Sequence, residues 1–311
     1  MGKEIEPKPT GPSRPYRLKR KEEPTEGIVR IAAGRAEKAV EELRRTGGSG
    51  DFADAVHSAR KDLKKLRSAL RLVRAELGEK RFRAENSRYR DAGQRLSASR
   101  DAEVKLETLA ALQRRFPGEL PDGSVDEWKE LLSRERIGPA DDDALAAQIE
   151  SAIGEIEAGR DEIVRWHLSA ESWDLLAPGI GRAYKRGRRE MHRARARRGA
   201  EDAHNWRKRA KDLWYQLRIV RGSWPAVVGE LAGQAHELAD LLGAHHDLTV
   251  LGEDLRARAQ LANGEALAAA IARRQDELLD DALRLGERIY AEKPRAFLRR
   301  HRAYWECWRE E

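Results

Sequence analysis

The chain carries one eighteen-residue pattern twice, and the pattern repeats its charged residues as well as its apolar ones. Residues 57–74 read HSARKDLKKLRSALRLVR, residues 204–221 read HNWRKRAKDLWYQLRIVR, and nine positions are identical without a gap. A repeat that served packing alone would keep its apolar residues and let its charges vary, so this repeat indicates one anionic ligand shared by two related halves. The matched polar pairs are His57 and His204, Arg60 and Arg207, Lys61 and Lys208, Lys64 and Lys211, Arg71 and Arg218, and Arg74 and Arg221.

Helical periodicity separates a basic face from an apolar face in each repeat. At about 100° per residue, the basic positions fall within an arc of roughly 140°, and an apolar stripe that includes Leu66, Leu70 and Val73 is centred roughly 120° away. The alternative is an ordinary solvated face, but such faces usually intersperse acidic residues as i,i+4 partners. Only Asp62 and Asp212 interrupt the two runs, and neither falls within the arc. We therefore predict two amphipathic helices, each with a basic face that is available to a ligand.

Composition favours an all-helical protein and concentrates its positive charge in the repeat regions. Hydrophobic residues make up 40% of the 311 residues and charged residues 37%, and no alternating apolar run suggests a sheet, so the expected fold class is all-α. The net charge is +7, but residues 57–100 carry +9 and residues 182–221 carry +11, which leaves −13 on the rest of the chain. Such focused charge is typical of an anion site. Phosphate chains, nucleic acid and an anionic membrane are the candidate ligands.

Cysteine usage and hydropathy bear on the compartment. The single cysteine, Cys307, excludes an internal disulfide and a cysteine-based zinc cage, which is typical of a reducing compartment. The N-terminal residues lack the apolar core of a secretory signal, and no stretch approaches the roughly 18 apolar residues of a membrane span. We therefore expect a cytoplasmic protein that has no membrane partner and needs no cofactor.

The organisation along the chain indicates an arm followed by one helical domain. Residues 1–24 hold five of the eleven prolines and mixed charge, which predicts a disordered arm. Residues 25–311 form the predicted domain, with a first half of about 25–160 and a second half of about 161–311. The first basic helix is expected over about residues 51–77. In the second half, His246 and Asp247 are expected at a helix start, as Arg100 and Asp101 are in the first half.

Four stretches in this order resemble the CHAD domain, the conserved histidine α-helical domain. They read VHSARKDLKKLRSALRLVR, LSASRDAEV, YKRGRR with AHNWRKRAKDLWYQLR, and LLGAHHDLTVL, and the resemblance covers about residues 26–311. It implies two similar antiparallel bundles about a pseudo-twofold axis, with a basic central groove or pore that binds inorganic polyphosphate. Polyphosphate granules are then an expected location within the cytoplasm. Members are often fused to a CYTH triphosphate-tunnel domain, but no strand-rich segment is present here, so we expect a stand-alone member.

The resemblance also assigns polyphosphate contacts to individual side chains. From the first half they are His57, Arg60, Lys61, Lys64, Arg67, Arg71, Arg74, Arg90, Arg95 and Arg100. From the second half they are Tyr184, Arg186, Arg189, His204, Arg207, Lys208, Lys211, Arg218, Arg221 and His246. The halves differ at two matched places, where Trp214 replaces Arg67 and His246 replaces Arg100, which implies a weaker grip or a stacking contact in the second half.

The chemistry of these residue types suits a linear polyanion. Arginine offers a planar fork to phosphoryl oxygens and lysine a mobile charge, and neither reads a base when it tracks a backbone. His57 and His204 titrate near neutrality, so a bound phosphate chain would favour their protonated form and strengthen binding as the pH falls from about 8 to 6. The alternative is that both histidines only cap or pack between helices.

Two other functions share part of this signal. A nucleic-acid-binding protein would use the same electrostatics, but no fold signature or aromatic platform for nucleic acid is apparent. A metal-dependent phosphohydrolase could use His245, His246 and Asp247, but it needs further ligands, and the cations beside the other histidines would repel a metal. No nucleophile motif or phosphate-binding glycine loop is present. We therefore predict a binding protein with no catalytic residue and no metal site.

Overall fold

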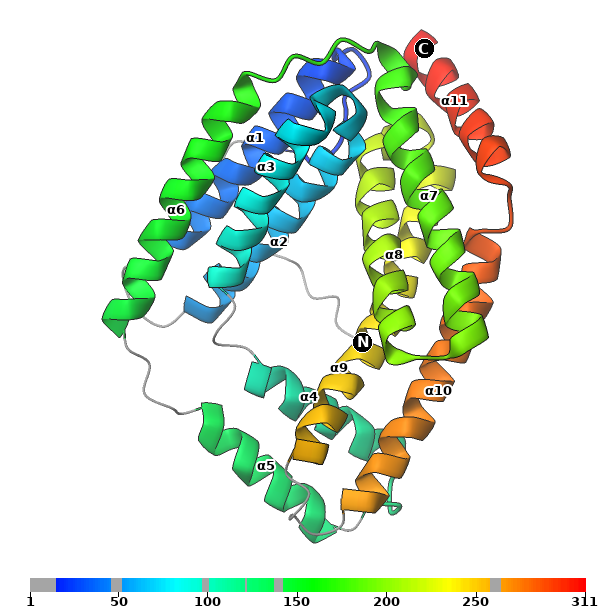
Figure 1. Ribbon diagram of the computed structural model, residues 1–311. Helices are drawn as coiled ribbons and strands as arrows, with labels where there is room; N and C mark the ends of the chain where they lie inside the picture. Colours follow the sequence, from blue (N-terminus) through cyan, green and yellow to red (C-terminus); the bar gives the residue numbers. More distant parts are fainter. Residues whose placement is uncertain (1–14, 46–51, 97–100, 121, 137–141, 258–263) are drawn as a thin grey trace.

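The computed structural model describes residues 15–45, 52–96, 101–120, 122–136, 142–257 and 264–311, and every regular element within these ranges is a helix (Figure 1). The predicted all-α class is therefore confirmed. The first bundle contains α1 (Pro24–Arg44), α2 (Phe52–Leu72), α3 (Arg74–Arg95) and α6 (Asp142–Val164). The second contains α7 (Ser172–Arg197), α8 (Ala200–Val220), α9 (Glu230–Ala257) and α10 (Gly264–Ile289). The C-terminal helix α11 (Pro294–Glu310) packs against α7.

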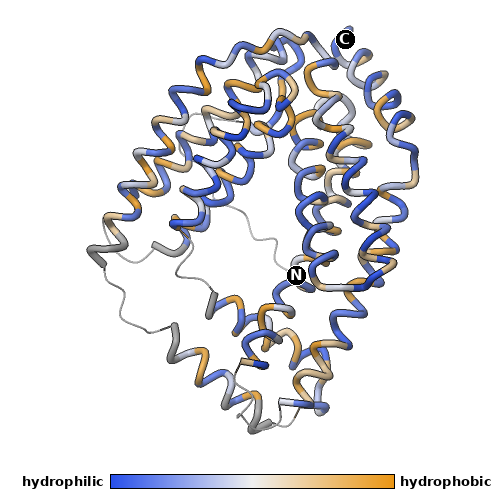
Figure 2. Tube along the Cα trace, in the orientation of Figure 1, coloured by the Kyte–Doolittle hydropathy of each residue, from blue (hydrophilic) through white to orange (hydrophobic). Residues whose placement is uncertain are grey.

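The apolar stripes of the two repeats form the centre of the main core. Leu66, Leu70 and Val73 of the first repeat are buried, and so are Trp206 and Leu213 of the second. Figure 2 shows hydrophobic and hydrophilic residues recurring in turn along the helices of both bundles, as expected where each helix buries one face. The prediction of an apolar packing face in each repeat is confirmed.

One helix boundary agrees with the prediction in part and another differs. The helix expected over residues 51–77 is interrupted at Val73, with φ −98° and ψ 17°, and the helical stretch that follows breaks at Gly78, with φ 71° and ψ 159°. The expected helix start at His246 and Asp247 is wrong, since both lie in the middle of α9. That helix continues because Leu242, before them, and Leu248, after them, remain buried in the protein interior.

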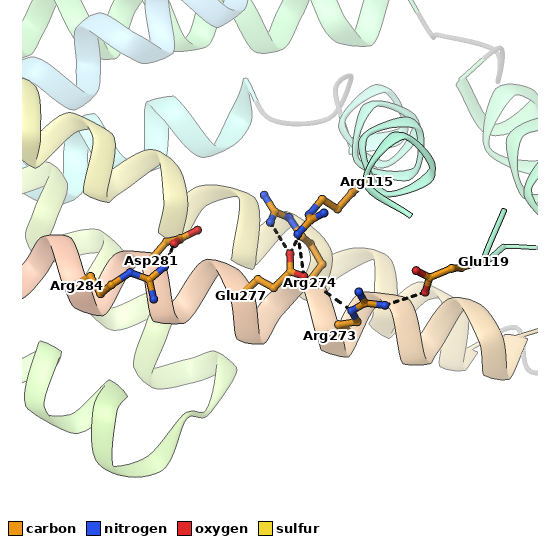
Figure 3. A network of polar contacts seen from close by, with 7 residues as sticks. All are labelled: Arg115, Glu119, Arg273, Arg274, Glu277, Asp281 and Arg284. Carbon is orange, nitrogen blue, oxygen red and sulfur yellow. Dashed lines mark hydrogen bonds and ion pairs between the residues drawn. The ribbon is translucent and has the colours of Figure 1, made fainter. Parts of the chain in front are cut away.

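A second, smaller core lies at one end of the molecule. The helices α4 (Asp101–Arg115) and α5 (Asp122–Arg136) bury Leu109, Phe116 and Trp128 against the ends of α9 and α10. Figure 3 shows the ion pairs that hold this end together. Glu277 of α10 accepts hydrogen bonds from Arg115 of α4 at 3.0 Å and from its neighbour Arg274 at 2.8 Å. The Arg115 contact holds α4 on α10, α5 packs against α4, and both lie at the end of the molecule opposite the point where the two bundles meet (Figure 1).

Residues 15–23, which we call the strap, pack across the junction between the two bundles. The sequence predicts these residues to be part of a disordered arm, and the structure corrects this prediction. Tyr16 is 8% exposed and Leu18 is 2% exposed, and the Leu18 amide donates a hydrogen bond of 2.9 Å to the Ile219 carbonyl of α8. The sequence did not predict this burial, because it depends on contacts with α2 and α8, which lie far from the strap in the sequence. Residues 1–14 lie outside the described residues.

Within the described residues, none of the helices combines the length and apolar character that crossing a membrane requires.

Candidate anion-binding site

The two basic repeats lie on α2 and α8, which run in the same direction and converge toward their C-terminal ends (Figure 1). An ion pair of 3.1 Å between Arg71 of α2 and Asp212 of α8 joins the two helices where they are close. Their N-terminal halves, which carry His57 and His204, are farther apart in the same view, where the labels and colours locate each helix. The two basic rows therefore approach each other at an angle, with the bundles on either side.

Matched lysines from the two repeats lie opposite each other in this angle. Desolvation by the surrounding protein, followed by repulsion from Lys211, lowers the pKa of Lys64 to about 8. Desolvation and the neighbouring Arg207 likewise lower the pKa of Lys211 to about 8. Arg60 and Lys61 also repel Lys64. Among the described residues neither lysine forms an ion pair, although Asp240 and Asp247 lie near enough to raise the pKa of Lys211 and so offset part of the repulsion.

The histidine of the second repeat pairs with a histidine of α9. The rings of His204 and His246 lie 4.2 Å apart between centroids, at an interplanar angle of 36°. Desolvation, with repulsion from His246, lowers the pKa of His204 to about 4, and burial lowers the pKa of His246 as well. His204 is therefore neutral at physiological pH, and its buried Nδ1 has no hydrogen-bond partner among the described residues. His57 is half-buried at the matched position on α2.

A cavity lined by five arginines lies beside the contact between α2 and α8. Its arginines come from both bundles, and they are Arg71, Arg74, Arg182, Arg186 and Arg209. Asp212 accepts from Arg71 at 3.1 Å and from Arg209 at 2.8 Å. Sequence comparison of the repeats missed Arg209, because Asp62 occupies its matched position, and it missed Arg182, because the YKRGRR motif begins two residues later.

Five other predicted residues each pair with a side chain of their own bundle. Desolvation, with repulsion from Arg71, lowers the pKa of Arg67 to about 10, and its Nε donates to Asn86 at 3.1 Å. The remaining ones pair with neighbours as follows: Arg90 with Asp91 at 2.8 Å, Arg95 with Glu155 at 3.8 Å, Arg189 with Glu190 at 2.7 Å, and Lys208 with Asn205 at 3.2 Å. The three arginines with carboxylate partners are partly neutralised within their own bundles, whereas the amide partner of Lys208 leaves its charge in place.

Three predicted residues do not join the site, and a fourth lies outside the described residues. Tyr184 is fully buried, stacks on the Phe297 ring at 3.9 Å and donates to the Glu292 carbonyl, so it belongs to the core and offers no surface to an anion. Arg218 and Arg221 lie beside the strap instead: the Arg218 guanidinium sits over the ring of Tyr16 at 5.6 Å. Arg100 lies outside the described residues.

The described residues offer no candidate metal site. Within them, no group of three or more His, Cys, Asp and Glu side chains is arranged to hold a metal ion. His245, His246 and Asp247 lie on successive positions of one helix, so their side chains point in different directions and do not converge.

Comparison with known proteins places the chain in a family. A model of the CHAD domain family matches residues 30–256. The crystal structure of the CHAD domain from the plant Ricinus communis superposes with a TM-score of 0.59, at 21% sequence identity, over 89% of this chain and 95% of that chain. No curated protein matches the chain. The matched helices include both basic repeats, and the chain belongs to the CHAD domain family.

Proposed function

We propose that this protein binds inorganic polyphosphate in the angle between α2 and α8, without converting it chemically. The observation that carries the proposal is the approach of Lys64 to Lys211: repulsion from Lys211 helps to lower the pKa of Lys64, and neither lysine forms an ion pair among the described residues. Opposed cations from two separate repeats repel each other unless an anion occupies the space between them. A multivalent anion that reaches both helices would relieve this repulsion.

The length of the basic rows favours a linear polyanion over a small one. The row from His57 to Arg71 lies within α2 and extends about 21 Å, because the two residues are fourteen steps of about 1.5 Å apart. A single phosphate or a dicarboxylate would engage only a small part of such a row. An extended phosphate chain can place one anionic group after another along it, which suits arginine and lysine contacts that fix charge rather than sequence.

A nucleic acid would share these charges but would need a surface on which its bases can stack. Among the described residues, the large hydrophobic side chains that stand exposed are Val164 and Trp224, and neither belongs to α2 or α8. Trp214 of α8 is only half-buried, but its ring already stacks on Tyr215 at 4.4 Å. The site helices therefore favour a chain without bases.

Binding to long-chain polyphosphate, measured by calorimetry, tests this proposal. The double substitution Lys64→Glu and Lys211→Glu should lower the affinity by at least about 100-fold, because it replaces two attractions by two repulsions. A matched control, Arg295→Glu with Arg299→Glu, makes the same change in net charge on exposed positions of α11 and should leave the affinity within about threefold. Equal losses in both variants would mean that net charge alone attracts the ligand.

Competition and product analysis separate the two other functions. Short double-stranded DNA should displace long-chain polyphosphate only weakly if the angle between α2 and α8 fits a narrow chain. Efficient displacement would favour the nucleic-acid function. Release of phosphate from the bound chain in the presence of divalent metal would identify a phosphohydrolase instead.

A further inference from the structure

The arginine cavity continues from a wide outer part into a narrow inner part. The outer part has a volume of about 470 Å³ and the inner part about 50 Å³, and Arg74, Arg182 and Arg186 line both. Glu79 borders the outer part, and Asp212 borders the inner part. Five arginines and two carboxylates leave three positive charges around one small space. The cavity is therefore strongly selective for an anion.

Two of these arginines have no carboxylate partner. Arg74 pairs with Glu79 at 2.5 Å, whereas Asp212 is shared by Arg71 and Arg209. Among the described residues, Arg182 and Arg186 make no ion pair. Burial is the main cause that lowers the pKa of both, with repulsion from Arg74 acting on Arg182 and from Arg209 acting on Arg186. These two guanidinium groups have the capacity to receive a phosphoryl group.

The inner part is closed where α7 meets α2. Gly179 of α7 lines it, and a Cβ atom placed on this glycine would lie 2.2 Å from the carbonyl oxygen of Leu72. The two backbones are thus in direct contact at Gly179, which closes this side of the inner part. An inner part of about 50 Å³ with such a wall suits the end of a chain better than its middle.

In the repeat alignment, the inner part of the arginine cavity corresponds to a second place on the other side of the junction, and the strap fills that second place. Lys65 occupies the repeat position that matches Asp212, and its backbone carbonyl accepts a hydrogen bond of 3.0 Å from the Tyr16 hydroxyl. The Tyr16 ring also packs edge-on against Tyr215, at 6.3 Å between centroids, and under Arg218, which matches Arg71. The strap therefore leaves only one of the two matched places open.

We infer that the arginine cavity binds the terminal phosphoryl group of a polyphosphate chain, and that each protein molecule has one such end site. This inference rests on the proposed function. A terminal phosphoryl group carries up to two negative charges near neutral pH and three acceptor oxygens, which suits Arg182 and Arg186. From the cavity the chain would follow Arg71 and Arg67, one turn apart on α2, toward Lys64.

Calorimetry with two probes tests the end site: long-chain polyphosphate with free ends, and the same chain with both ends capped as phosphoramidates of a bulky amine. The free chain should bind about tenfold more tightly, the difference expected from one lost charge-assisted contact. Arg182→Ala should abolish this difference by weakening only the free chain. The matched control Arg218→Ala should preserve it, because Arg218 lies beside the strap and lines neither part of the arginine cavity. Thermal melting of each variant confirms that it is folded.

Equal affinities for the free and capped chains would overturn the end site, as would an equal loss for both chains in Arg182→Ala. The Lys64→Glu, Lys211→Glu variant distinguishes a failure of the end site from a failure of the proposed function. If that variant loses the capped chain while capping itself has no effect, the proposed function stands and only the end site fails. If it binds the capped chain normally, the proposed function fails.

Discussion

Raising the pH from about 7 to about 9 is expected to weaken polyphosphate binding, because the two opposed lysines lose their protons in this range. The pKa of each is about 8 in the free protein. A bound phosphate chain favours the charged form and raises both values to about 10.5 or above. Binding therefore takes up protons above about pH 7, and affinity is highest where both lysines are already protonated.

The two shifts set the size of the effect. A lysine whose pKa rises from about 8 to about 10.5 on binding weakens the association about tenfold between about pH 7 and about pH 9. Lys211 is half-buried and contributes close to this amount. Lys64 is more exposed, so solvent screens its interactions and it contributes less. Deprotonation of both lysines over this pH range should therefore lower the affinity by between about 10- and 100-fold.

The assay is calorimetric titration with long-chain polyphosphate over this pH range at constant ionic strength, in two buffers of different ionisation enthalpy so that proton uptake is measured directly. The control variant Lys64→Arg with Lys211→Arg keeps both charges but does not titrate in the range. Its affinity should change by less than about threefold. The reasoning is refuted if the unmodified protein shows a flat profile with no proton uptake, or if the arginine variant retains the full pH dependence.

Three further outcomes are expected. Affinity for polyphosphate should fall more than about 100-fold between roughly 50 and 500 mM salt, because binding releases counterions, and a change below about tenfold would contradict a multivalent contact. Gly179→Ala should lower the free energy of unfolding by about 2 kcal/mol or more and Tm by roughly 4 °C or more, because its Cβ would meet the Leu72 backbone. The control Gly154→Ala, whose Cβ would meet nothing within 4 Å, should not lower Tm in the same melting experiment. The pKa of His204 in the free protein is about 4, so His204 should strengthen binding only as the pH falls through its higher pKa in the complex toward 4. His204→Gln should therefore flatten the affinity profile in that range. An unchanged profile would make His204 structural.

Helical periodicity predicted the parts of the molecule that depend on one helix at a time. The apolar stripes with Leu70 and Trp206 are buried as expected, because a face that is apolar over several turns has to pack against something. The opposed positions of Lys64 and Lys211 agree with a repeat that serves one ligand, although their role as polyphosphate contacts stays a prediction.

The sequence did not reveal how the helices of the two halves pack against one another. Tyr184 shares a basic helix with Arg186, yet its ring turns toward α11 and the core. Arg209 faces the arginine cavity because α8 also packs against the first bundle, which no pattern within α8 indicates. Tyr16 follows a proline-rich stretch that reads as an arm, and only the junction of two distant helices gives it a place to be buried.

A crystal structure of the protein with polyphosphate tests the central claim most directly. The account predicts phosphate density in the angle between α2 and α8, within hydrogen-bond distance of both Lys64 and Lys211. Density confined to other surfaces of the molecule, with these two lysines left as they are in the free protein, would contradict it.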